Sequence, residues 1–224
     1  MRIAMRIRLG LPLAAMLSLV CASTSLAAPK PVFTYTGDAY NLSVTGTLLG
    51  NPLTPITLNE VGPIDTTTGE GNRSKIMFES VPLLGLTAKQ LLSTVFTGQG
   101  RTKATTRASG VKVLTVPGSA PPISTGGIRS SSLTKCDKYT GALTTVGLAT
   151  VGFIQIGTQK IRVAHNPTPP NDTVSLGSLG SVTFNEETPT TDGLSVNAVD
   201  LNLTTSLGPV EVIIGHAESG LDNC

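Results

Sequence analysis

The chain is poor in the residues on which most enzyme sites depend. It has no tryptophan and two histidines, and charged residues make up 13% of its 224 residues, about half of the ~25% found in ordinary globular proteins. With so few aromatic side chains, a carbohydrate site built on ring stacking is hard to support. We expect hydroxyl and amide groups to cover the surface. A mean hydropathy of +0.19 argues that the chain folds.

Recognisable catalytic motifs are also absent. The sequence contains no G-x-S-x-G, phosphate-binding glycine loop or dinucleotide fingerprint. An S-x-x-K pattern at Ser132 and Lys135 lies in a strand-like run without its S-D-N and K-T-G partners. Glu186 and Glu187 would suggest a glycosidase pair, but neighbouring residues on a strand point to opposite faces. We therefore predict no catalytic residues and no cofactor.

The first ten residues are basic and lead into an apolar run. Arg2, Arg6 and Arg8 precede about 14 apolar residues, too few for the ~20 that a bilayer-spanning helix needs. This pattern predicts a signal peptide over residues 1–27 and a single exported domain over residues 28–224, secreted or held at the cell surface. We expect no integral membrane segment in the mature chain, and we disfavour a lipid on Cys21 because Val20 precedes it.

The net charge of the mature chain does not indicate a particular class of partner. Without residues 1–27, 13 Lys and Arg stand against 14 Asp and Glu. The basic isoelectric point of the whole sequence therefore belongs largely to the signal peptide. A mature chain with a net charge of about −1 gives no reason to expect a nucleic-acid partner.

Two cysteines remain after removal of the signal peptide. In a chain exported from the reducing cytosol, Cys136 and Cys224 are expected to form a disulfide. The chain-entropy model gives such a bridge about 3 to 5 kcal/mol, as an upper figure. The alternative is a bridge between two molecules through Cys224.

Alternating apolar and polar residues recur along the mature chain, with Gly, Pro, Asn and Asp between the runs. This pattern predicts an all-β fold, a single antiparallel β-sandwich-like domain with long Pro/Gly loops. Residues 86–96 could imitate a helix start at Thr87, but their composition favours a strand. Gly157 and Thr158 predict a two-residue hairpin turn. Residues 194–203 change phase after Ala198, which suggests a β-bulge.

Four segments together carry a resemblance to a known family. In order they are "AYNLSVTG", "PNDTVSLGSLGSVTFNEE", "GLSVNAVDLNL" and "VEVIIGHAESGLDNC", and they span residues 37–224. The sequence resembles the choice-of-anchor P family of secreted bacterial proteins, whose members carry different surface-sorting tails. The resemblance implies an exported domain and supplies no catalytic residues. Because no LPxTG-like motif follows the last strand here, we expect a domain that is released or held by other proteins.

Two groups of residues are candidates for binding. Arg101, Lys103 and Arg107 fall on one face of a strand and could bind an acidic glycopolymer or a protein, although such a stripe also serves to keep an edge strand solvated. A weaker zinc hypothesis combines His165, His216, Glu218 and Asp222. Each histidine continues the phase of an apolar strand face, but no HxxxH, HxH or CxxC spacing supports a metal site.

The sequence thus favours an exported, non-catalytic structural or interaction module of the cell surface or extracellular space. The second interpretation is a module that binds glycan or a cell-envelope polymer, and a hydrolase comes third. The candidate partners are a cell-envelope polymer and a surface protein.

Overall fold

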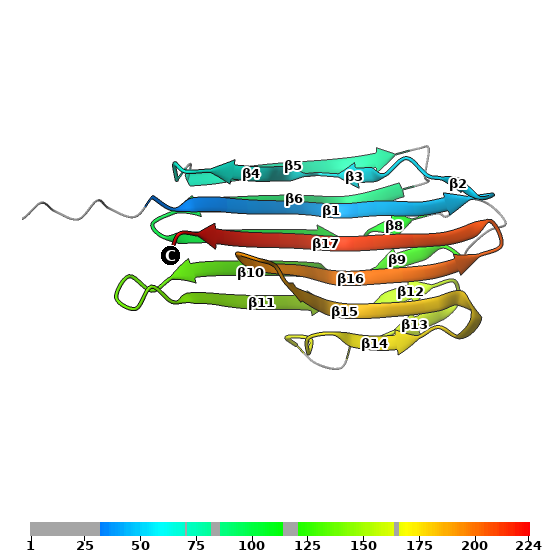
Figure 1. Cartoon of the computed structure of the whole chain (residues 1–224). Helices are drawn as coiled ribbons and strands as arrows, with labels where there is room; N and C mark the ends of the chain where they lie inside the picture. The colour runs from blue at the N-terminus through cyan, green and yellow to red at the C-terminus, as the bar shows by residue number, and fades with distance from the viewer. Residues whose placement is uncertain (1–31, 70, 82–85, 114–120, 164–165) are drawn as a thin grey trace, which may run out of the picture. The chain divides into compact units, whose positions relative to one another are not determined.

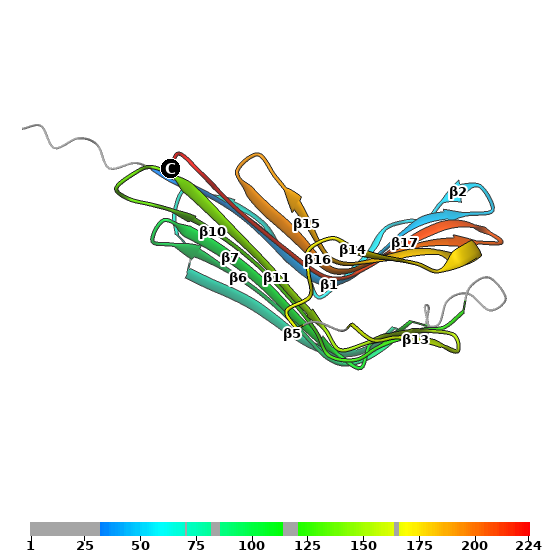
Figure 2. The ribbon, with the colours of Figure 1, turned by 90° about the horizontal axis from the view of Figure 1, so that it is seen from below.

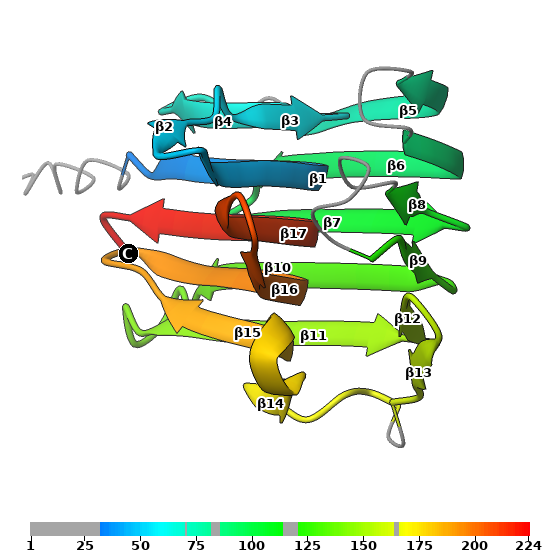
Figure 3. The same cartoon turned by 90° about the vertical axis from the view of Figure 1, so that its right-hand side faces the viewer.

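In the part of the chain that the structure describes, seventeen β-strands in two antiparallel sheets make up almost all of the regular structure (Figure 1). The computed structural model describes residues 32–69, 71–81, 86–113, 121–163 and 166–224. The predicted signal peptide lies outside the described residues. The part from Pro31 to Cys224 forms one unit, in which the two sheets pack against each other as separate layers (Figure 3). The predicted all-β sandwich is confirmed.

The first sheet, called the β17 sheet, is built from the two ends of the chain. Its strand order is β14-β15-β16-β17-β1-β2, and β3 and β4 also pair with β1. The bounds are β1 Thr34–Leu48, β2 Asn51–Pro52, β3 Ile56–Leu58, β4 Val61–Thr66, β14 Asp172–Ser175, β15 Gly180–Pro189, β16 Gly193–Thr205 and β17 Gly208–Asp222. A 3-10 turn at Gly177–Leu179 joins β14 to β15, and the two strands pair as an antiparallel hairpin.

The second sheet, called the β7 sheet, is built from the middle of the chain. Its order is β11-β10-β7-β6-β8-β9-β12-β13, with β5 beside β6. The bounds are β5 Gly71–Val81, β6 Leu86–Gly98, β7 Arg101–Ser109, β8 Lys112–Val113, β9 Ile123–Thr125, β10 Ile128–Cys136, β11 Leu143–Val151, β12 Ile154–Ile156 and β13 Gln159–Ile161. The segment that could have been a helix is strand β6, and β12 and β13 form the expected hairpin around Gly157 and Thr158.

Apolar side chains from both sheets meet between the layers. The largest cluster includes Phe184, Leu201 and Ile214 from the β17 sheet with Leu91 and Ile154 from the β7 sheet. These residues occupy the inward positions of alternating strands, where burial of apolar area is the main source of stability. Within the described residues no helix is long and apolar enough to cross a membrane.

Hydroxyl groups fill another part of the space between the sheets. Thr102 donates to the carbonyl of Gly220 (2.8 Å), and Thr134 donates to the carbonyl of Ser219 (2.8 Å). Ser132 donates to the carbonyl of Leu194 (2.7 Å), and its hydroxyl lies 2.7 Å from that of Ser219. Several hydroxyls therefore also hold the two layers together by satisfied buried hydrogen bonds.

The strands of the β17 sheet bend along one shared line (Figure 2). On β16, Val196 and Ala198 face the core before the bend, and Val199 and Leu201 face it after the bend. The consecutive residues Ala198 and Val199 are therefore both buried. The pairing of β16 with β17 nevertheless keeps one register on both sides of this point. The predicted phase change is therefore present, but the two-against-one pairing of a β-bulge is not, because the neighbouring strands change phase with β16.

Gly215 is the β17 residue on this line. Its φ of +76° lies in the left-handed region that favours glycine. An added Cβ would also lie 3.1 to 3.2 Å from Thr106, Ala198 and Ile128. The bend therefore depends on a residue without a side chain at this position.

A disulfide joins the end of β10 to the residues after β17. The Cα atoms of Cys136 and Cys224 are 5.4 Å apart, and the bridge closes a separation of 88 residues. This agrees with the predicted intramolecular pairing. Because β10 belongs to the β7 sheet and β17 to the other sheet, the bridge links the two layers covalently.

Candidate functional site

Charge is segregated between the two sheets. Residues 73–162, which include nearly all of the β7 sheet, contain twelve Lys and Arg and only two acids, Glu79 and Asp137. Residues 31–72 and 163–224, which supply the β17 sheet, contain twelve acids and no Lys or Arg. The near-zero net charge of the mature chain therefore hides two layers of opposite sign.

The basic residues of the β7 sheet gather on its outer face. Arg101, Lys103 and Arg107 are exposed on β7, while the residues between them are buried or half-buried. On β10, Lys135 lies directly opposite Arg101, and Arg129 lies opposite Arg107. These five residues are called the basic face. Strands β6, β7, β10 and β11 carry no Asp or Glu, so no carboxylate on these strands neutralises it.

This arrangement is unfavourable for the fold itself. Like charges directly opposite each other on antiparallel strands are destabilising, and the basic face has two such pairs. Part of the cost is relieved locally, since the Arg101 guanidinium lies 4.9 Å from the centre of the Phe96 ring. Positions where such a local rule is broken are where function is expected.

An open hollow of about 360 Å³ lies within the basic face. Arg107 and Arg129 line it, together with the polar residues Gln90, Ser109 and Thr150. Nε of Arg129 is buried and has no hydrogen-bond partner among the described residues. Two guanidinium groups, an amide and two hydroxyls therefore surround a space that fits an anionic group such as a phosphate, sulfate or carboxylate.

The outer face of the β17 sheet is acidic. Asp38 lies on β1, Glu186 on β15, Asp200 on β16, and both Glu211 and Glu218 on β17. These five residues are called the acidic face. The pKa of Asp38 is raised to about 6, first by burial and then by the charge of Glu60. The pKa of Asp200 is raised to about 7 by burial and by Glu186 and Glu211. Both shifts come first from burial of the carboxyl group, and the neighbouring carboxylates add to it.

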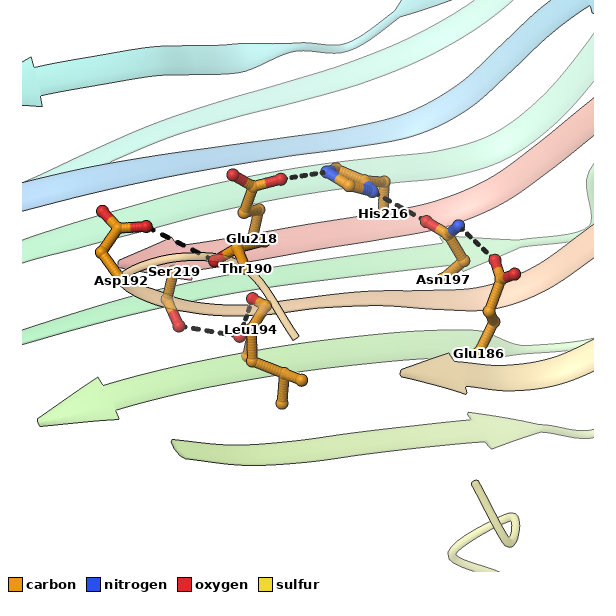
Figure 4. Close-up of polar contacts among 9 residues, drawn as sticks. Glu186, Thr190, Asp192, Leu194, Asn197, His216, Glu218 and Ser219 are labelled. Carbon is orange, nitrogen blue, oxygen red and sulfur yellow. Dashed lines mark hydrogen bonds and ion pairs between the residues drawn. The ribbon is translucent and has the colours of Figure 1, made fainter. Parts of the chain in front are cut away.

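His216 lies between Glu218 and Asn197 on the acidic face, and Asn197 in turn contacts Glu186 (Figure 4). Asn197 donates its amide to Glu186 (2.8 Å), so its carbonyl oxygen accepts from Nδ1 of His216 at 2.7 Å. This network assigns the histidine proton to Nδ1. Burial lowers the pKa of His216 to about 4, so the ring is neutral at neutral pH. Its Nε2 lies 3.8 Å from Glu218, which is therefore a neutral contact and not an ion pair.

The predicted position of His216 is wrong. We expected it to continue the inward phase of Val212 and Ile214 to the rim of the core. The phase changes at Gly215, so His216 faces outward and Ala217 faces the core. The backbone conformation of one glycine therefore moved the histidine to the other side of the sheet.

The weak zinc candidates are only partly brought together. Glu218 lies beside His216, whereas Asp222 follows four residues later on β17, about 13 Å away at the usual rise of a strand. His165 lies outside the described residues. Among the residues that the structure describes, no group of three or more His, Cys, Asp or Glu could hold a metal ion.

The remaining candidates for catalysis lie on separate faces. Glu186 points outward to Asn197, whereas Glu187 lies on the other face near Gly147. Ser132 is buried between the sheets and Lys135 is exposed. Neither pair can therefore act on one bond.

The sequence predicted three of the five residues in the basic face. Arg129 and Lys135 were missed because they belong to another strand, and only the register of β7 and β10 places them beside Arg107 and Arg101. The uneven distribution of Lys and Arg along the chain was a usable signal that the net charge concealed. The chain matches no family model, no curated protein and no solved structure.

Proposed function

We propose that the protein is an exported, non-catalytic interaction module that attaches to an anionic polymer of the cell envelope through its basic face. The observation that carries this proposal is the group of five cations on one sheet surface whose central strands contain no acid. Export itself is supported by the N-terminal sequence pattern, by the disulfide and by the resemblance to the choice-of-anchor P family.

The spacing of the cations suits a ligand with repeated charges. Alternate residues on a strand are about 6.6 Å apart, and neighbouring strands are about 4.8 Å apart. Arg101 and Lys103 are therefore separated by about one sugar unit, and the cations of β10 form a second row beside them. Several weak contacts to one chain add to a useful affinity through high effective concentration.

The hollow at Arg107 and Arg129 would hold one anionic group of such a polymer. Guanidinium groups match phosphate, sulfate and carboxylate by paired hydrogen bonds, and Nε of Arg129 is available for one of them. Gln90, Ser109 and Thr150 offer further hydrogen bonds to hydroxyl groups of the ligand. Recognition in this form depends on charge and hydrogen bonds, which agrees with the lack of tryptophan.

Retention on dextran sulfate tests this function with a defined probe. The R101Q/K103Q/R107Q variant removes three charges of the basic face, and K89Q/K138Q/K160Q is a control that removes three charges elsewhere. We expect the first variant to bind about tenfold more weakly at low salt, since each charged hydrogen bond contributes about 1.5 to 3 kcal/mol at most, and the control to bind nearly as the native protein does.

The same measurement then uses isolated envelope polymers. Equal losses for both triple variants would mean that only net charge matters, and the basic face would not be the binding site. Native binding that is unchanged between low salt and 1 M salt would also contradict the proposal, because screening at 1 M reduces the Debye length to about 3 Å.

A further inference from the structure

The acidic face needs a cationic partner that its own sheet does not supply. No strand of the β17 sheet contains Lys or Arg, and the nitrogen that Glu218 contacts belongs to neutral His216. Thr45 and Asn197 satisfy Glu211 and Glu186 by hydrogen bonds, but neither brings a positive charge. Burial first, and neighbouring carboxylates second, raise the pKa values of Asp38 and Asp200.

We propose that a second copy of this chain supplies the missing cations, its basic face lying against the acidic face of the first. Both surfaces belong to the same molecule, and each lacks within its own sheet the charge that the other offers. Complementary charged patches steer two proteins together and fix their orientation. The proposal is independent of polymer binding.

The two faces lie on opposite layers of the sandwich (Figure 3). A contact between the acidic face of one copy and the basic face of another is therefore heterologous, using different surfaces on the two partners. Each contact leaves one free acidic face and one free basic face. Such contacts continue into open chains of molecules unless a rotation closes them into a ring.

The backbone geometry is compatible with stacking in one direction. Figure 2 shows that both sheets bend in the same sense, the β17 sheet within its long strands and the β7 sheet where its long strands end and the short strands β8, β9, β12 and β13 continue it. The outer face of one sheet can therefore follow the outer face of the other sheet in the next copy. The cations near the bend, Arg107 and Arg129, would then approach Glu186 and Glu211, which lie on either side of the bend in the β17 sheet.

The stacking contact and the polymer would use the same basic face. A polyanion must therefore compete with stacking, and a molecule bound to the polymer would still present its acidic face. Stacking and polymer binding can nevertheless be measured independently of each other. Self-association is measured without any polymer, and polymer binding is measured where the protein is a monomer.

Two variants, each of which lacks one of the two charged faces, test the stacking. R101Q/K103Q/R107Q keeps the acidic face but lacks most of the basic face, and E186Q/E211Q/E218Q keeps the basic face but lacks most of the acidic one. Neither variant can stack with itself. An equal mixture can form one contact only, so sedimentation at low salt should show each variant alone as a monomer and the mixture as a 1:1 dimer that does not grow.

The native chain is the reference in this experiment. Its mean mass should rise with concentration beyond a dimer at low salt and return to that of a monomer in 1 M salt. Far-ultraviolet circular dichroism confirms that each variant is folded. If E186Q/E211Q/E218Q is not folded, E211Q/E218Q replaces it.

Several outcomes overturn the proposal. These are a native chain that stays monomeric at millimolar concentration and low salt, folded variants whose mixture forms no dimer, or either variant associating alone as strongly as the native chain. If the native chain binds dextran sulfate but does not associate, stacking is wrong and the proposed function stands.

Discussion

The imidazole ring of His216 is stacked on the phenol ring of Tyr40. The ring centres are 4.3 Å apart and the planes are inclined by 12°, and the two residues are directly opposite each other on β17 and β1. Stacking covers one face of the histidine, while Asn197 occupies its Nδ1. This enclosure is the physical reason why the ring stays neutral although carboxylates surround it.

His216 makes stability depend on pH. Its pKa is about 4 in the folded state and 6.5 in the unfolded chain, so the unfolded chain takes up a proton first as the pH falls. Its contribution is complete above pH 6.5 and is lost down to pH 4, to a total of about 3 kcal/mol. Urea unfolding of His216→Gln should lack this component of the slope. An unchanged pH slope would show that the ring titrates normally.

The raised pKa of Asp38 makes stability change with pH in the opposite direction from that of His216. Its pKa is raised from 3.8 to about 6, so the folded state holds the proton more tightly, and stability falls as the pH rises from about 4 to 6. Asp38→Asn should therefore unfold at higher urea than the native protein at pH 7.5 and at about the same urea at pH 4. Asp65→Asn, an exposed change on β4, serves as control. A stabilisation of equal size at both pH values would contradict this account.

Gly215→Ala tests the bend of the β17 sheet. The substitution places a Cβ in a left-handed conformation and 3.1 to 3.2 Å from Thr106, Ala198 and Ile128. We expect a loss of about 2 kcal/mol in the free energy of unfolding, from backbone strain and overpacking. Gly50→Ala also has a positive φ but open space around the Cβ, so it should cost about 1 kcal/mol. Equal losses would mean that packing at Gly215 is unimportant.

Reduction of the disulfide should destabilise the domain. The bridge between Cys136 and Cys224 closes 88 residues, and the chain-entropy model gives about 3 to 5 kcal/mol as an upper figure. C136S/C224S should unfold at lower urea than the native protein, and dithiothreitol should bring the native protein to the midpoint of the variant. A native midpoint that is insensitive to dithiothreitol would show that the bridge contributes nothing.

Arg129→Met separates stability from binding. Arg129 is opposite Arg107, and its buried Nε has no partner in the described part of the chain. Removing it should raise the free energy of unfolding by about 1 kcal/mol and weaken retention on dextran sulfate. Arg129→Lys keeps the charge but not the planar group, and it should retain part of the binding. A variant that gains no stability and loses no binding would remove Arg129 from the proposed site.

Local patterns predicted the strands well because inward and outward positions alternate in the sequence. Local patterns did not predict which hydroxyl groups are buried. Ser132 and Thr134 have the composition of exposed strand positions, but they form hydrogen bonds with Ser219 of the other sheet. Nor could local patterns predict that Gly215 reverses the direction of His216. Such features depend on register and on backbone conformation shared by several strands.

The candidate site was only partly predictable for the same reason. Arg101, Lys103 and Arg107 belong to one strand, and period-two alternation places them on one face. Their neighbours Arg129 and Lys135 are distant in sequence, and only the pairing of β7 with β10 brings them together. The uneven distribution of charged residues along the chain can be seen in the sequence. That each charged segment belongs to one sheet is known only from the structure.

The separation of charge between the two sheets gives the molecule a permanent electric dipole across its layers. A protein of this kind turns in the field of a charged surface before it touches it, so it arrives with a preferred side down. On a negative surface the basic layer settles inward and the acidic layer faces the medium. A coated surface would then keep its negative zeta potential while its chemistry changes from that of the polymer to that of a protein.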